Sequence, residues 1–134
     1  MSEKSSTIYT FQNHEYDLKI TYGFAIKTLK TDFGIDLTNL LADEVLDKVL
    51  NQMFLNDDLP LRLWRYYVSK HLGESGVDEA LNDLTPANLQ QFKDVWWNSV
   101  RLFIGPLRGE ILSQILKEAP NLFKKNISQS LAQS

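Results

Sequence analysis

The segment between Thr85 and Pro106 constrains the fold more than any other part of the chain. Thr85 suits a helix N-cap, Pro86 suits the first helical position, and Gly105 followed by Pro106 interrupts a helix. Between these signals, apolar residues recur at helical spacing and cover an arc of about 220° at about 100° per residue. We therefore expect a helix over residues 86–104, most of it buried at the centre of a helical fold.

Four further segments also carry apolar residues at helical spacing. We expect them to form helices over residues 22–33, 39–55, 60–73 and 107–119. Gly34 can end the first of these helices in a left-handed conformation, and Gly73 can end the third. The four residues from Gly73 to Gly76 are then expected to form a loop, because glycines at both ends favour a turn.

Residues 8–20 carry the only period-two alternation in the chain, which predicts a β-hairpin with residues 12–15 in its turn. An isolated hairpin is only marginally stable in water, so one of its faces should be covered by helices. That face consists of Tyr9, Phe11, Tyr16, Leu18 and Ile20. The expected fold class is mostly α, a compact bundle of about five helices with a small N-terminal β-hairpin.

A chain of 134 residues with 43% hydrophobic residues is expected to form one domain around one core. Residues 1–120 should form this single helical domain. Residues 121–134 are expected to form a flexible C-terminal tail. Within it, residues 126–134 are rich in Ser and Gln and are expected to be disordered or weakly helical. The polar first residues and the lack of an apolar run of about 20 residues predict a protein that is not exported and has no membrane anchor.

The charges of the chain argue against nucleic-acid binding. The formal net charge is −3, the sequence pI is about 5.3, and no continuous basic stripe is present. Acidic residues concentrate in residues 36–58 and 74–94, whereas basic residues concentrate in residues 62–70 and 101–125. Alternating blocks of this kind are typical of complementary helix faces within one fold, and self-association is the less common alternative.

The sequence contains little that could perform catalysis. It has two histidines, His14 in an expected turn and His71 near a helix end, and no cysteine. Known metal, phosphate-loop and nucleophile motifs are absent. We therefore expect no enzymatic activity, cofactor or metal site. The enzymatic alternative would require a cleft in which His14 or His71 meets a carboxylate at hydrogen-bonding distance.

The aromatic residues near the end of the expected helix 86–104 have two interpretations. Burial in the core is the favoured one. In the alternative, one flank of the helix contacts a partner, since exposed aromatic rings contribute strongly to binding helical segments. The candidate partner-binding residues are Trp96, Trp97, Arg101, Phe103 and Ile104.

A resemblance to a known family lies in residues 16–37, which read YDLKITYGFAIKTLKTDFGIDL. This stretch resembles the N-terminal signature of the tail assembly chaperones of long-tailed bacteriophages. In that family a short strand runs into a helix that ends in Gly-Ile-Asp, matched here by Gly34, Ile35 and Asp36. An apolar helix and further helices follow, as they are expected to do in this chain.

The resemblance implies a non-enzymatic protein that binds the long, helical tape measure protein, keeps it soluble and helps to recruit tail tube subunits. It also implies self-association, action in the cytoplasm of the bacterial host, and absence from the mature virion. Such binding is physically reasonable because a groove between helices can cover the apolar stripe of another helix. The alternative is a small helical structural or adaptor subunit of a phage tail or head–tail connector.

Overall fold

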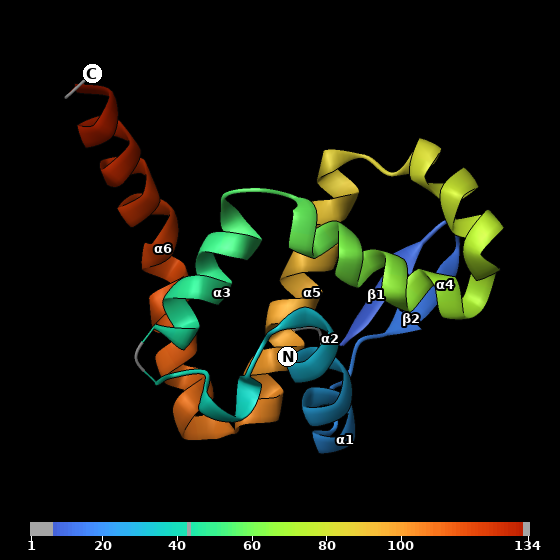
Figure 1. Ribbon diagram of the computed structural model, residues 1–134, viewed down its shortest axis with the longest axis horizontal. Helices are drawn as coiled ribbons and strands as arrows, with labels where there is room; N and C mark the ends of the chain where they lie inside the picture. Colours follow the sequence, from blue (N-terminus) through green and yellow to red (C-terminus); the bar gives the residue numbers. More distant parts are fainter. Residues whose placement is uncertain (1–6, 43, 133–134) are drawn as a thin grey trace.

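The fold is mostly α-helical, with a small N-terminal β-hairpin, as the sequence predicts (Figure 1). The computed structural model describes residues 7–42 and 44–132, with side chains described as far as residue 121. The elements are, in order, β1 (Ile8–Phe11), β2 (His14–Asp17), α1 (Tyr22–Phe24), the π-helix η2 (Ala25–Lys30), α2 (Thr31–Phe33), the 3₁₀-helix η3 (Leu37–Asn39), α3 (Val45–Phe54), α4 (Asp58–Ala80), the 3₁₀-helix η4 (Leu81–Asp83), α5 (Pro86–Ile104) and α6 (Pro106–Ala132).

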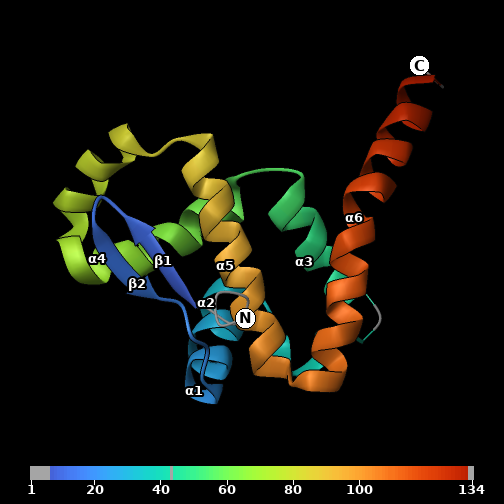
Figure 2. The same cartoon turned by 180° about the vertical axis from the view of Figure 1, so that it is seen from behind.

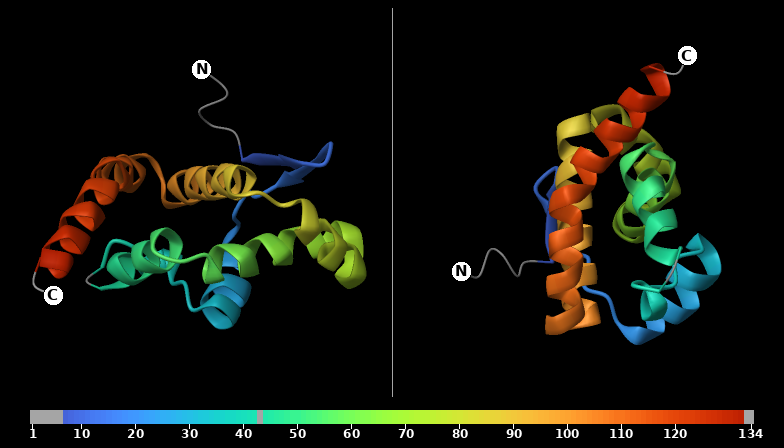
Figure 3. Two further views of the ribbon diagram at one scale, coloured as in Figure 1. Left: turned by 90° about the horizontal axis from the view of Figure 1, so that it is seen from above. Right: turned by 90° about the vertical axis from the view of Figure 1, so that its left-hand side faces the viewer.

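Strands β1 and β2 pair antiparallel, with Tyr9 opposite Tyr16. Gln12 and Asn13 form a two-residue turn, shorter than expected, and both have positive φ, as tight hairpin turns require. All five apolar residues predicted to face the helices are buried. Figure 3 shows the hairpin beside α5. Its Tyr9 and Phe11 side chains also contact Trp64 on α4, so both helices cover this face.

The predicted helix over residues 22–33 is confirmed as one continuous helical segment, α1, η2 and α2. The Thr21 side chain accepts a hydrogen bond from the Phe24 amide at 3.2 Å and caps its start. Gly34, at φ 70°, ends it in the left-handed conformation. Its middle, Ala25–Lys30, is wound as a π-helix, which its apolar spacing did not reveal.

Two other predicted boundaries are wrong. The helix expected over residues 39–55 begins only at Val45, because Glu44 has φ 68°, which interrupts a right-handed helix. The loop expected over residues 73–76 is absent. Gly73, at φ 75° and ψ 171°, kinks α4, and the helix resumes beyond it to Ala80.

The last helix also continues beyond its expected end at residue 119. Helix α6 passes through Pro120 and runs to Ala132, so residues 121–132 are helical, and weakly helical structure is one of the two forms expected for the end of the chain. Residues 133 and 134 lie outside the described part of the chain. The flexibility of residues 121–134 stays a prediction.

Helix α5 begins and ends where the sequence predicts and lies at the centre of the fold. Thr85 accepts a hydrogen bond from the Asn88 amide at 3.2 Å at its start. Phe92, Trp96 and Val100 on this helix are fully buried, which confirms the core interpretation of α5. The Tyr9 ring from the hairpin packs edge-on against Phe92 with centroids 5.2 Å apart.

A close contact between two helices sets the position of α6. Gly105, at φ 95°, ends α5, and the Gly109 amide donates a 2.7 Å hydrogen bond to its carbonyl. A Cβ atom on Gly109 would lie 2.7 Å from the Arg101 carbonyl oxygen, so only glycine fits without displacement. From this contact α5 and α6 diverge, as Figure 2 shows.

Candidate functional site

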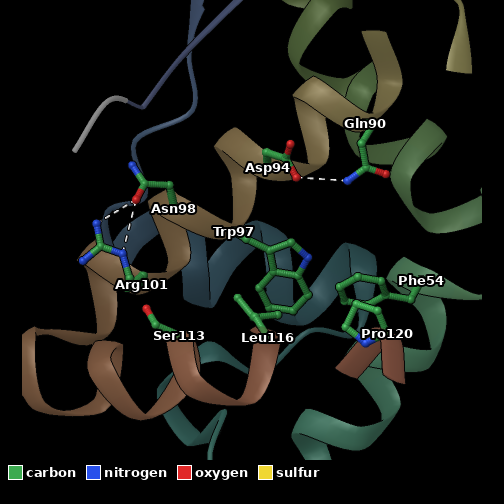
Figure 4. A pocket seen from close by; sticks show the side chains of 9 residues that line it. All are labelled: Phe54, Gln90, Asp94, Trp97, Asn98, Arg101, Ser113, Leu116 and Pro120. Atoms are coloured by element: carbon green, nitrogen blue, oxygen red, sulfur yellow. Dashed lines mark hydrogen bonds between the residues drawn. The ribbon is translucent and has the colours of Figure 1, made fainter. Parts of the chain in front are cut away.

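A groove of about 420 Å³ opens where α5 and α6 diverge, and α3 closes one end of it (Figure 4). Each helix presents a different part of its surface. Helix α3 contributes its last residue, Phe54, and α6 contributes one face of its middle turns. The lining residues are Phe54 from α3, Gln90, Asp94, Trp97, Asn98 and Arg101 from α5, and Ser113, Leu116 and Pro120 from α6.

The floor of the groove is apolar. The Trp97 indole stacks on the Phe54 ring with centroids 6.3 Å apart and planes at 23°. Figure 4 shows Leu116 and Pro120 beside these two rings. Trp97 is 6% exposed, so the groove reaches one edge of a side chain that otherwise belongs to the core.

The α5 side of the groove carries polar side chains that hydrogen-bond to one another. Gln90 donates to Asp94 at 3.0 Å. The Arg101 guanidinium donates twice to the Asn98 side-chain oxygen, at 2.7 and 3.2 Å. An apolar floor beside fixed polar groups is typical of grooves that bind an amphipathic segment in one orientation.

The five predicted partner-binding residues are divided between the groove and other parts of the fold. Trp97 and Arg101 line the groove. Trp96 and Ile104 are buried in the core. Phe103 is half-buried at the end of α5, where its ring meets the exposed Tyr22 ring with centroids 4.8 Å apart. In this conformation Trp96 and Ile104 are therefore not accessible to a partner.

Sequence reasoning missed the groove residues that come from other helices. Phe54 and Leu116 were recognisable only as apolar positions on their own helices, and Pro120 only as a helix end. Their convergence on Trp97 depends on the angle between α5 and α6, which the Gly109 contact sets. A glycine in the first turns of α6 is the one local signal that could have indicated a close helix crossing.

Further apolar side chains are exposed outside the groove, on α1, η2, α5 and α6. Leu107 is 76% exposed and Tyr22 is 64% exposed, and Ile26, Leu102 and Ile111 are also exposed. Leu107 and Ile111 are one turn apart on α6 and therefore lie on the same face of that helix. At about 100° per residue, this face lies opposite the face of α6 that carries Ser113, Leu116 and Pro120 in the groove.

The residues Gly34, Ile35 and Asp36 have clear structural roles. Gly34 ends the first helix, and Ile35 is fully buried. The Asp36 carboxylate accepts hydrogen bonds from Asn39 at 2.9 Å and Thr38 at 2.8 Å, which lower its pKa. These three residues therefore stabilise the turn into η3.

Ion pairs join the charged segments at the surface. Lys93 on α5 pairs with Asp57 at 3.3 Å, and Arg65 on α4 pairs with Asp78 at 2.9 Å across the kink at Gly73. The Arg65–Asp78 pair joins a basic block to an acidic block, as expected for charge blocks that match one another within the fold, whereas Lys93 and Asp57 both lie in acidic blocks. The Arg65 and Asp78 side chains are both exposed, so their pair should contribute at most about 1 kcal/mol to stability, whereas the Lys93 side chain is only 14% exposed.

The two histidines meet each other rather than an acid. Their ring centroids lie 4.6 Å apart. Among the described residues, neither imidazole has a hydrogen bond or ion pair to a carboxylate, and no three His, Cys, Asp or Glu side chains gather as a metal cluster. A hollow of about 390 Å³ beside His71 is lined by Tyr16 and Tyr67. Burial raises the pKa of both phenols and keeps them neutral.

No helix in the described part of the chain combines the length and apolar character that crossing a lipid bilayer requires. Comparisons of the chain with protein-family models, with curated proteins and with solved structures found no match.

Proposed function

We propose that the protein is a non-enzymatic tail assembly chaperone of a long-tailed bacteriophage, which binds the helical tape measure protein and keeps it soluble. The observation that carries the proposal is the groove between α5 and α6, with its apolar floor and hydrogen-bonded polar side. The resemblance of residues 16–37 to the family supports the choice of partner.

Binding would work by masking apolar surface. A tape measure helix exposes side chains at positions i, i+3, i+4 and i+7, which form an apolar stripe. A groove of about 420 Å³ has room for a few anchoring side chains of that stripe. Trp97 provides the rigid aromatic contact typical of residues that dominate binding energy. The exposed Leu107 and Ile111 form a second apolar face of α6, opposite the groove, that could take part in self-association.

The proposal includes the partners and location that accompany such a chaperone. The protein would assemble as a homo-oligomer around its client in the host cytoplasm, assist tail tube assembly, possess no cofactor, and leave before the virion is complete. Self-association is consistent with the apolar residues that remain exposed on α1, η2, α5 and α6.

The test is co-expression with a long tape measure fragment that is insoluble alone. We expect the fragment to become soluble and to co-purify with the protein. Ser113 points into the groove from α6, so Ser113→Arg should fill the groove and abolish this effect. Gln114→Arg places the same side chain on the next, exposed residue of α6 and should leave the effect intact.

The other possible results of the co-expression experiment lead to different conclusions. A fragment that stays insoluble with the unmodified protein contradicts the chaperone function. If the Ser113→Arg variant still solubilises the fragment, the chaperone function holds, but the fragment binds to a surface other than the groove. Recovery of the protein from purified particles in stoichiometric amounts would instead indicate the structural or adaptor subunit.

A further inference from the structure

The chain has two histidines, and the fold places their rings side by side. His14 begins β2, and His71 lies on α4, 57 positions later in the sequence. Their ring centroids are 4.6 Å apart with planes at 58°, and both residues are exposed. The pair therefore joins the hairpin to α4 at a surface that solutes can reach.

We propose that His14 and His71 form a two-histidine site for a divalent transition-metal ion such as Zn²⁺, Ni²⁺ or Cu²⁺. Imidazole nitrogens are ligands that these ions prefer. A metal–nitrogen distance of about 2.0–2.1 Å places the centroids of two rings on one ion roughly 4.5 Å apart at a nitrogen–metal–nitrogen angle of about 90° and roughly 5.2 Å apart at the tetrahedral angle. The observed separation of 4.6 Å lies at the lower end of this range, and both rings are exposed.

The surroundings leave both imidazoles available for a metal. Within the described residues, no hydrogen bond or ion pair engages either ring. The Tyr16 ring packs edge-on against His71 with centroids 5.8 Å apart, so it supports one side of the pair. The nearby Lys70 ammonium lies over the Tyr66 ring, 4.4 Å from its centroid.

The ligand set determines which ions bind. The described residues bring no third His, Asp or Glu to the pair, and the chain has no cysteine. Water molecules would therefore complete the coordination. Mg²⁺ and Ca²⁺ require several oxygen ligands and should not bind here. A bound transition-metal ion would tie β2 to α4 and stabilise the folded chain by mass action.

The experiment uses the full-length chain without a histidine tag and adds Zn²⁺ or Ni²⁺ alone. Calorimetry should show one ion per chain, thermal melting should shift upward, and the side-chain NMR signals of both histidines should move. Mg²⁺ and Ca²⁺ should have no effect. Because loss of an outer partner already weakens metal binding about 10- to 100-fold, His14→Gln and His71→Gln should each weaken it at least about tenfold.

Glu15→Gln is the matched control, because it changes an exposed neighbour of His14 without removing an imidazole. It should bind as the unmodified chain does. Binding that survives either histidine substitution, or that moves only one histidine signal, would overturn the two-histidine site. So would the absence of any melting shift, or a stoichiometry of one ion per two chains, which indicates a link between molecules.

Discussion

At the scale of single residues, the Tyr9 side chain links the β-hairpin to two helices of the core. Its hydroxyl accepts a 3.0 Å hydrogen bond from the Trp64 indole nitrogen on α4 and donates to the Asn88 side chain on α5. Its ring is fully buried against Phe92. One side chain thus connects the hairpin to two helices, and the polar atoms it brings into the core are paired.

Tyr9→Phe should destabilise the protein because it leaves the buried Trp64 indole N–H without an acceptor. We expect a loss of about 1–3 kcal/mol in the free energy of unfolding, measured by urea denaturation. Tyr22→Phe removes the same hydroxyl at an exposed position and should change stability by less than about 0.5 kcal/mol. Equal losses from the two substitutions would contradict this role for the Tyr9 hydroxyl.

At the scale of elements, the angle between α5 and α6 depends on Gly109. Gly109→Ala puts a methyl group 2.7 Å from the Arg101 carbonyl oxygen and forces the helices apart. We expect a loss of about 1–3 kcal/mol, measured by urea denaturation.

Gly23→Ala is the matched control for this substitution. Gly23 lies in α1, the nearest atom to its new Cβ is the Thr21 side-chain oxygen at 3.9 Å, and alanine favours helix formation. Gly23→Ala should therefore stabilise the chain by about 0.4–1 kcal/mol. If Gly109→Ala were equally stabilising, the helices would not be in contact at that residue.

The elements also show how much of the fold local sequence could predict. The ends of α5 were predictable because Thr85, Pro86 and Gly105 each act on the backbone within a few residues. The end expected at Pro120 was wrong, because a proline weakens a helix locally but does not decide whether the helix continues. The same holds for Gly73, which ends one helical stretch but does not prevent another from starting.

The candidate site was less predictable than the fold for a related reason. Sequence periodicity showed that Trp97 lies at the edge of an apolar arc, and the structure places that edge in the groove. Phe54 and Leu116 reach the groove from α3 and α6, and their approach depends on packing between distant segments. The meeting of His14 and His71 has the same origin, since no spacing rule relates positions so far apart.

At the scale of the whole molecule, buried tyrosines link folding to alkaline pH. Burial raises the pKa of Tyr9 from 10.0 to about 12, and burial also raises the pKa of Tyr16 and Tyr67. Above pH 10 the unfolded chain has lost protons that the folded chain retains. The stability contributed by these neutral phenols is therefore complete below pH 10 and declines as the pH rises towards 12.

We expect alkaline unfolding in which part of the tyrosinate absorbance appears together with the loss of the circular dichroism signal. Tyr9→Phe removes one of the coupled groups, so the tyrosinate signal that accompanies its unfolding should be smaller. Ionisation of all five tyrosines while the dichroism spectrum stays native would contradict the prediction.

Because Ala25–Lys30 is wound as a π-helix, this helix should tolerate the deletion of one residue, which the α-helices of the chain should not. A π-turn is an α-helix with one extra residue, so deleting the exposed Lys27 should convert it to ordinary winding and keep both flanking faces in place. Deleting Gln91 should instead rotate the rest of α5 by about 100° about the helix axis and move the Trp96 side chain out of the core. We expect the variant without Lys27 to unfold in a cooperative thermal transition and the variant without Gln91 to lose that transition. This result would show that the π-helical turn contains one residue that the fold does not require.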